Sequence, residues 1–227
     1  MDQATAKQLA ARAALEQLPE AGIIGLGSGS TAKLFIDGVG ALVQRGRKLQ
    51  GVATSQASRI QAEELGIPLL SDEGPWSIDV CVDGADEVSE ALDLIKGGGG
   101  CHAREKIVNH ASRKNIIIVD ESKLSRRLGE RWAVPVEVLV FGHQATAKRL
   151  ERFGATRLRM REGQPQVTDA GNYIYDVQGG PIDAPAEIDA LLRGIPGVVA
   201  TGLFCGRADL VIVAGAGGIY EQRRSSS

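Results

Sequence analysis

The amino-acid sequence predicts an α/β protein in which a doubly wound parallel sheet carries a smaller inserted α+β domain. Three observations lead to this prediction. Apolar strands alternate with helices up to about residue 133, as in parallel sheets with right-handed crossovers. Residues 134–204 then follow the order strand, helix, strand, strand, helix, strand of the ferredoxin-like module. An apolar strand at 209–214 suits the parallel sheet, so the module is predicted to be an insertion.

We therefore expect a Rossmann-like domain formed by 1–133 plus 207–227 and a small ferredoxin-like domain formed by 134–206. Apolar residues at three-and-four spacing predict a first helix that ends near Pro19. The other elements expected in the first domain are strands at 23–27, 49–54, 67–70, 77–82, 115–120 and 209–214 and helices after residue 31, at 58–65 and at 101–111. Those expected in the small domain are strands at 134–140, 157–160, 172–176 and 198–204 and helices at 144–153 and 182–192. The tail Glu221–Ser227 is expected to fray.

Composition argues against several classes of function. The net charge of −2 offers no basic face for nucleic acid or an acidic membrane, and four Phe, two Trp and three Tyr are too few for base stacking. The distant Cys81, Cys101 and Cys205 fit thiols in a reducing compartment better than a disulfide framework, and Cys101 beside His102 is weak evidence for a metal. Early charges and the lack of a long apolar stretch predict a cytoplasmic protein without signal peptide or membrane span.

An acid follows the strand 77–82 directly. Asp83 is therefore expected at the carboxyl end of a parallel strand, which is the edge where open α/β sheets bind ligands. Asp86 lies three residues on, across Gly84 and Ala85, and can face the same pocket. Repulsion between two such carboxylates would raise the pKa of one, which would leave one proton donor and one charged acceptor. The alternative is that both acids only form a solvated turn.

Four consecutive glycines follow Lys96. Such a run loses much backbone entropy inside a helix or strand, and it lets a ligand approach main-chain amides. The amides of Gly97, Gly98 and Gly99, with Lys96, are predicted to form a donor cradle for a carbonyl oxygen or a phosphate. Glu105 falls in the first turns of the next helix, where the helix dipole alone also favours an acid. Because that dipole lowers a carboxylate pKa, a basic role for Glu105 requires burial to raise it again.

The turn Ser28-Gly29-Ser30-Thr31 joins the first strand to a helix, an arrangement that presents amides and the positive helix end to an anion. The segment 27–32 also satisfies a permissive dinucleotide fingerprint, but the acid expected about 20 residues on is absent, and the turn lacks the lysine of a Walker loop. A hydroxyl-lined pocket for one phosphate remains. A helix N-cap at one of the last two turn residues is a compatible alternative.

Lys123 follows another strand that ends in an acid, Asp120. Because it leaves the same sheet edge as Asp83, we expect it to add positive charge to the pocket. A solvated surface lysine is the alternative.

With these motifs in place, the chain resembles the ribose-5-phosphate isomerase family of the A type. The matching segments are GLGSGSTA at 25–32, VDGADEV at 82–88, IKGGGG at 95–100, REKI at 104–107, DESK at 120–123, VPVEV at 134–138, PGVV at 196–199 and GLF at 202–204. The resemblance covers nearly the whole chain. It implies that ribose 5-phosphate and ribulose 5-phosphate are interconverted in the non-oxidative pentose phosphate pathway, without metal or nucleotide, by a homodimer or homotetramer. Cys101 and His102 depart from the apolar pair usual in the family, which is expected to alter the packing of the glycine loop slightly.

The resemblance also implies roles for single residues. Glu105 is implied to be the base that moves a proton through an enediol, and Lys96 with the glycine amides would meet the developing charge. Asp83 is the acid expected to help ring opening, and Asp86 to hold hydroxyl groups. The residues implied to bind substrate are Ser28, Gly29, Ser30, Thr31, Asp83, Gly84, Ala85, Asp86, Lys96, Gly97, Gly98, Gly99 and Lys123.

Two other functions stay open at this point. A metal-dependent phosphohydrolase or phosphotransferase would use Asp83 and Asp86 as magnesium ligands. A sugar-phosphate-sensing module would bind without turnover, although the sequence shows no helix-turn-helix or basic segment beside it. Activity that survives a strong chelator would eliminate the first alternative.

Overall fold

The structure is a computed structural model and describes residues 1–224. By the contacts between its residues, the chain divides into two compact units. The first unit consists of Met1–Ala85, Arg104–Lys123 and the described chain from Arg207 onward, and the second of Asp86–Ala103 and Leu124–Gly206. These units differ from the predicted domains at 86–103 and 124–133, where the two divisions assign the residues to opposite parts. The predicted domain bounds stay a prediction.

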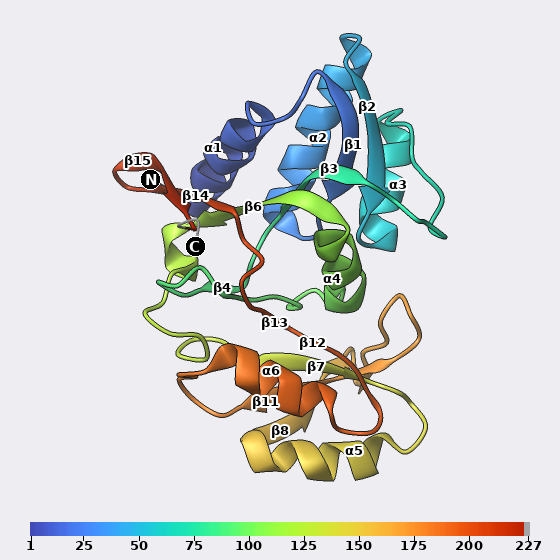
Figure 1. Ribbon diagram of the computed structural model, residues 1–227, viewed down its shortest axis with the longest axis vertical. Coiled ribbons are helices and arrows are strands. Elements are labelled where there is room, and N and C mark those ends of the chain that lie inside the picture. Colours follow the sequence, from blue (N-terminus) through green and yellow to red (C-terminus); the bar gives the residue numbers. More distant parts are fainter. Residues whose placement is uncertain (225–227) are drawn as a thin grey trace. The chain divides into compact units, whose positions relative to one another are not determined.

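The first unit is built on a six-stranded sheet in the order β15-β14-β6-β3-β1-β2 (Figure 1). All neighbouring strands are parallel except β14 and β15, which form an antiparallel hairpin at one edge. The strands are β1 (Ala21–Leu26), β2 (Lys48–Ala53), β3 (Ile78–Asp83), β6 (Ser112–Asp120), β14 (Leu210–Gly215) and β15 (Gly218–Arg223). The helices are α1 (Gln3–Leu15), α2 (Ser30–Gln44), α3 (Gln56–Glu64) and α4 (His102–His110), and a 3-10 turn η1 (Glu121–Lys123) follows β6.

The central strands are apolar on both sides because helices cover both faces of this sheet. From β3, Val80 and Val82 join the core with α1, α2 and α3, whereas Cys81 packs with Val108 of α4. A side chain at Gly25 of β1 would collide with both Cys81 and Val108, so glycine allows α4 to lie this close to the sheet. The predicted doubly wound parallel sheet is confirmed.

The second unit contains the predicted strand-helix-strand-strand-helix-strand module. Its four-stranded antiparallel sheet has the order β12-β7-β11-β8. The elements are β7 (Val134–Val138), α5 (His143–Leu150), the 3-10 turn η2 (Glu151–Phe153), β8 (Ala155–Leu158), β11 (Tyr173–Gln178), α6 (Pro185–Arg193) and β12 (Val198–Thr201). Leu150 of α5 and Leu192 of α6 share one core with Val136 of β7. The predicted ferredoxin-like α+β module is confirmed.

Two small sheets of the second unit were not predicted. A three-stranded sheet in the order β13-β5-β4 is formed by Leu203–Phe204, Leu94–Ile95 and Glu87–Val88. A short hairpin is formed by β9 (Met160–Arg161) and β10 (Gln164–Pro165). Strands of two residues are too short for alternation of apolar and polar side chains to reveal them.

Three expected elements differ from the structure. Segment 67–70 makes only a bridge from Leu69 to Gly51, since Pro68 has no N–H to donate. The first helix ends at Leu15, because the buried Leu18 extends the apolar pattern beyond the helix itself. The expectation of a frayed tail was wrong for 221–223, which pair with β14, and its last part, 225–227, lies outside the described residues. No helix in the described chain combines the length and hydropathy needed to cross a bilayer.

Candidate active site

Asp83, Glu105 and Lys123 lie close to points where the chain passes from one unit to the other. It passes after Ala85 and again after Ala103. The first unit therefore carries Asp83 and Glu105, and the second carries the run Lys96–Gly100. Each unit thus has its own set of candidate groups.

Asp83 is the last residue of β3, and only 3% of its surface is exposed. Its Oδ1 accepts hydrogen bonds from two backbone amides, that of Ser28 at 3.0 Å and that of Gly84 at 2.7 Å. A side chain at Gly27 would collide with the Asp83 carboxyl group. The loop after β1 is therefore shaped around Asp83, and the two amides fix the direction of its carboxyl group.

Ser28 belongs to a network of four hydroxyl groups. Its Oγ lies 2.7 Å from Thr54 Oγ1 and 3.5 Å from Ser58 Oγ, and Ser58 Oγ lies 2.9 Å from Ser55 Oγ. Thr54 and Ser58 also donate to backbone carbonyl groups at the end of β1, at 3.0 Å and 2.6 Å. The network ties the loop after β1 to the start of α3, which Ser55 caps.

Three members of this network, Thr54, Ser55 and Ser58, were missed by the sequence prediction. All three are buried. A signal was present, because Thr54 and Ser55 follow β2 directly, just as Ser28 nearly follows β1, and parallel strands bring their carboxyl ends to one edge.

The amino end of α2 is open to an anion. Its N-cap is Gly29, with a φ of 92°, and no side chain in the described chain caps the helix. The alternative of a Ser30 or Thr31 cap is therefore wrong. Ser30 is instead the exposed first residue of the helix, and Thr31 is half-buried. The first-turn amides and the helix dipole remain to attract negative charge.

Glu105 lies in the first turn of α4 and is 5% exposed. Its neighbour Arg104 faces outward and forms an ion pair with Asp72 at 3.1 Å. An acid that served only the helix dipole would have no need of burial, and Glu187 in the first turn of α6 is indeed exposed. The burial on which the predicted basic role of Glu105 depends is present.

Asp120 ends β6 and lies close to Lys123. Its Oδ1 accepts hydrogen bonds from the amide and the hydroxyl group of Ser122, and its Oδ2 accepts one from Gln3 at 3.2 Å. Burial opposes the charge of Asp120, but these hydrogen bonds and the positive charge of Lys123 outweigh it and hold its pKa below the usual range. Lys123 itself is half-buried at the end of η1.

In the second unit, the glycine run is folded around Asp86. The amide of Gly98 donates to Asp86 Oδ2 at 2.6 Å, and the amide of Gly100 donates to the carbonyl group of Gly97 at 2.9 Å. Gly97 and Gly100 have φ values of 107° and 84°, where side chains are strained. These two positions therefore require glycine for the backbone itself.

Arg159 and Gln166 hold the carbonyl groups of the glycine run, and both were missed by the sequence prediction. Arg159 donates to the carbonyl groups of Gly97 at 2.6 Å and Gly98 at 3.1 Å, and Gln166 donates to that of Gly99 at 3.3 Å. Because N–H and C=O of one peptide point in opposite directions, the amides of Gly98 and Gly99 face away from Arg159.

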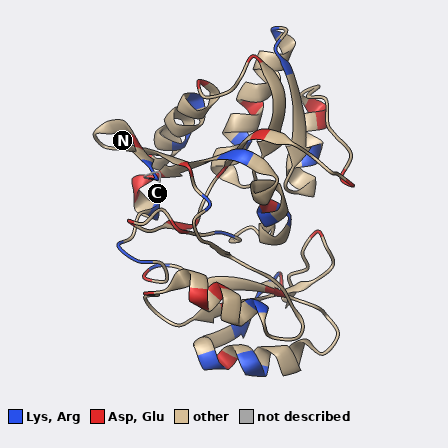
Figure 2. Cartoon of the chain, viewed as in Figure 1, with Lys and Arg blue, Asp and Glu red and all other residues tan. Residues whose placement is uncertain are grey.

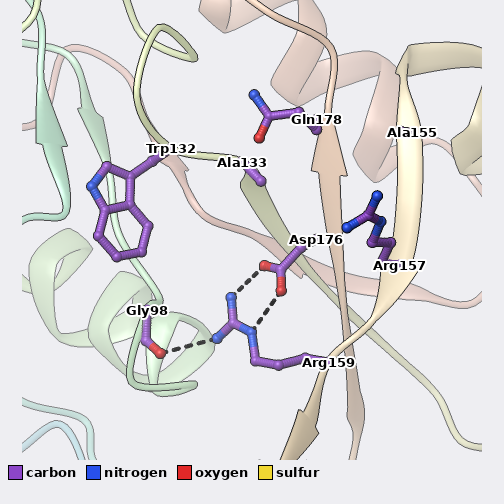
Figure 3. Close-up of a pocket in the computed structure, with 8 residues that line it drawn as sticks. All are labelled: Gly98, Trp132, Ala133, Ala155, Arg157, Arg159, Asp176 and Gln178. Carbon is purple, nitrogen blue, oxygen red and sulfur yellow. Dashed lines mark hydrogen bonds and ion pairs between the residues drawn. The ribbon is translucent and has the colours of Figure 1, made fainter.

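A bidentate ion pair fixes the Arg159 guanidinium group itself. Its Nε donates to Asp176 Oδ2 at 2.9 Å, and its Nη2 pairs with Asp176 Oδ1 (Figure 3). Such a fork sets the plane of the guanidinium group, which then presents its remaining donor to the glycine carbonyl groups.

Lys96 is 3% exposed and its Nζ lies 5.6 Å from the centroid of the Phe204 ring. The fully buried His102, at the start of α4, has its Nε2 3.9 Å from Glu137 Oε2, and a side chain at Gly97 would lie 2.7 Å from its Nδ1. His102 therefore packs directly beneath the glycine run. Residues 1–224 hold no cluster of three or more His, Cys, Asp and Glu side chains arranged for a metal ion.

Comparison with known proteins places the chain in a family. The family model described as ribose 5-phosphate isomerase A (phosphoriboisomerase A) matches residues 50–218. The chain belongs to the ribose 5-phosphate isomerase A family. This family interconverts ribose 5-phosphate and ribulose 5-phosphate, so the predicted family and the prediction of an isomerase are confirmed.

Relatives match over nearly the full length. A protein of Gloeobacter violaceus named ribose-5-phosphate isomerase A is 48% identical over 221 residues, which is 96% of each chain. A solved structure of D-ribose-5-phosphate isomerase in complex with phospho-erythronic acid has a TM-score of 0.95 and 38% identity, covering 99% of this chain and 100% of that one. The ribose 5-phosphate isomerase of Plasmodium falciparum has a TM-score of 0.94 and 32% identity, covering 98% and 100%.

Proposed function

We propose that this chain interconverts ribose 5-phosphate and ribulose 5-phosphate by proton transfer through an enediol, with Glu105 as the base. In the open-chain aldose, Glu105 takes the proton from C2, next to the C1 aldehyde, as the aldehyde oxygen gains a proton, which gives the enediol. Glu105, whose proton exchanges with solvent, then protonates C1 as the hydroxyl group on C2 loses its proton, which gives the ketose. One carboxyl group acting on one face of the substrate can carry out both transfers. The burial of Glu105 in the first turn of α4, directly after the glycine run, is the observation that carries the proposal.

We assign to Lys96 and the glycine amides the stabilisation of the negative charge that develops on the substrate oxygen. Lys96 is buried, so its charge acts where water does not screen it. The amide of Gly98 is used by Asp86, which leaves the amides of Gly97 and Gly99 for the substrate. Loss of one such donor commonly lowers the rate about 100-fold or more.

The two acids of the DGAD turn take different roles in this proposal. Asp83 assists ring opening and moves hydroxyl protons, and its carboxyl group is held in one direction by two amides. Asp86 holds sugar hydroxyl groups, with Gly84 and Ala85 as part of the sugar-binding turn. Asp83→Asn should slow turnover of the cyclic sugar more than that of the open-chain form, and Asp86→Asn should slow both alike.

The substrate phosphate is assigned to the turn 28–31 and Lys123. Ser28, Ser30 and Thr31 supply hydroxyl groups, the uncapped α2 supplies amides, and Lys123 supplies charge. The relative solved with phospho-erythronic acid supports a sugar-phosphate substrate, since that ligand joins a phosphate to a planar carboxylate with the shape of an enediolate. We further propose that the protein needs no cofactor, is cytoplasmic and forms a homodimer or homotetramer. Light scattering would measure the mass of this oligomer.

The decisive experiment is turnover of ribose 5-phosphate in deuterated water with EDTA present. We expect ribulose 5-phosphate with deuterium at C1 from the wild type, and loss of both product and label in Glu105→Gln, by about 100- to 10,000-fold. Glu187→Gln is a matched control, because Glu187 occupies the first turn of α6 but is exposed. Phosphate release, or activity abolished by EDTA, would point to a metal-dependent phosphohydrolase instead. Full activity of Glu105→Gln would refute the assigned base.

A further inference from the structure

The second unit contains a cavity of about 480 Å³ that the proposed mechanism does not use. It lies on the side of the glycine run that faces Arg159, opposite to the side on which the amides of Gly98 and Gly99 point. Its volume falls in the range of small-molecule sites, roughly 300–1,000 Å³.

Two opposite walls of the cavity offer different chemistry (Figure 3). The indole ring of Trp132, which is 37% exposed, lies on one side, and the guanidinium group of Arg157 lies on the other. A tryptophan face at this degree of exposure can stack on a planar ring. The cavity therefore has one aromatic wall and one cationic wall.

The charge of the lining favours an anion. Arg159 is neutralised by its bidentate pair with Asp176, whereas the Arg157 side chain makes neither hydrogen bond nor ion pair with any residue of 1–224. Gln178 adds an amide that can donate or accept. A guanidinium group without a protein partner is suited to bidentate recognition of phosphate or carboxylate.

We propose that this cavity binds a planar heteroaromatic ring joined to a phosphate, of the nucleoside monophosphate class, and that its occupant slows turnover. The ring stacks on Trp132 and the phosphate pairs with Arg157. Arg159 connects the cavity to the glycine run, because it lines the cavity and also holds the carbonyl groups of Gly97 and Gly98. A bound phosphate competes with those carbonyl groups for the Arg159 donors, which loosens the run.

Binding can be measured without any enzyme activity. The chain has two tryptophans, so Trp76→Phe leaves Trp132 as the only one, and its fluorescence reports on the cavity. We expect AMP to change this fluorescence with a submillimolar Kd, and Arg157→Gln in the same background to raise the Kd at least tenfold. Arg161→Gln, which removes an exposed arginine outside the cavity, should leave the Kd unchanged.

Titrations with adenosine and with inorganic phosphate test the ring and the phosphate of the ligand one at a time. Each alone should bind at least tenfold more weakly than AMP. Phosphate that binds as tightly as AMP would overturn the role of the ring. A fluorescence response to AMP that is absent, or that is identical in Arg157→Gln, would overturn the site.

The effect on turnover rests on the proposed isomerase function and is tested separately. AMP should lower kcat for ribose 5-phosphate without raising KM, and Arg157→Gln should abolish this inhibition while keeping the basal rate. An increase in KM alone would mean that AMP competes at the substrate site, and it would overturn the coupling. A chain without isomerase activity would refute the proposed function, while the fluorescence titration would still decide whether the cavity binds AMP.

Discussion

The backbone amide of Gly98 donates to Asp86 Oδ2 at 2.6 Å, and a methyl group at Gly98 would lie 2.7 Å from the other carboxyl oxygen. Gly98→Ala must therefore displace the carboxyl group that we assign to the sugar hydroxyls. We expect kcat/KM for ribose 5-phosphate to fall about 10- to 100-fold, since misplaced groups of this kind cost up to about 100-fold.

Gly217→Ala is the matched control for this substitution. Nothing lies within 4 Å of a methyl group there, and the residue does not have a positive φ. Its kcat/KM and Tm should equal those of the wild type. A Gly98→Ala enzyme with wild-type kinetics would show that the position of Asp86 does not matter for turnover.

Arg159→Lys should loosen the glycine run while keeping the positive charge. Lysine cannot reproduce the fork that binds Asp176 and at the same time donate to the carbonyl groups of Gly97 and Gly98. We expect kcat to fall at least tenfold and the amides of residues 96–100 to exchange faster with deuterium, as measured by mass spectrometry. Arg161→Lys, which changes a nearby exposed arginine, should affect neither quantity. Unchanged exchange in Arg159→Lys would contradict the supporting role.

The predictable part of the candidate site is the part that lies next to strand ends in the sequence. Asp83 follows a buried strand and Ser28 nearly follows another, so the rule that ligands bind at the carboxyl edge of a parallel sheet was enough to single them out. The glycine run was equally visible, because four glycines have few roles other than a tight, ligand-facing loop. Local sequence and the edge rule together account for these residues.

Arg159 and Gln166 could not be found in this way. They lie some 60 residues after the glycines whose carbonyl groups they bind, and no motif surrounds them. Their role depends on how β8 and the following hairpin pack against the run, and side-chain periodicity carries no information about such packing. Strand β15 was missed for a related reason, since Glu221, Gln222 and Arg223 match a polar tail and only pairing with β14 reveals the strand.

Thr54→Val tests whether the hydroxyl network positions the phosphate-binding turn. Valine keeps the shape of threonine but removes the contact of Oγ1 with Ser28 Oγ at 2.7 Å and the hydrogen bond to the Leu26 carbonyl group at 3.0 Å. We expect a loss of about 1 kcal/mol in the free energy of unfolding and a severalfold rise in KM, with kcat nearly unchanged. Thr146→Val also removes one buried hydroxyl group, which donates to Pro196 at 3.0 Å, and should lower stability without changing KM. Equal KM values in both variants would contradict the proposed role of Ser28.

Glu137 should make the folded chain less stable as the pH rises, which is the opposite of what most carboxylates in folded proteins do. It is 1% exposed on β7, where its Oε1 accepts hydrogen bonds from Thr168 at 2.8 Å and Asn172 at 2.9 Å, near the His102 imidazole. Burial raises its pKa above the usual 4.5, and the two hydrogen bonds only partly offset this. Between pH 4.5 and the folded-state pKa, the folded chain therefore holds a proton that the unfolded chain has released. Raising the pH through this window must lower the stability that Glu137 contributes.

Glu137→Gln removes the titrating group but keeps an oxygen that can accept from Thr168 and Asn172. The free energy of unfolding of the wild type minus that of the variant should therefore fall as the pH rises from 4.5, by at most about 1.4 kcal/mol per pH unit. It should level off above the folded-state pKa. Urea unfolding of both proteins across pH 4.5 to about 8 measures this difference. The exposed Glu187→Gln serves as the control and should show no such trend. A difference that grows with pH would mean that the hydrogen bonds, and not burial, dominate the ionisation of Glu137.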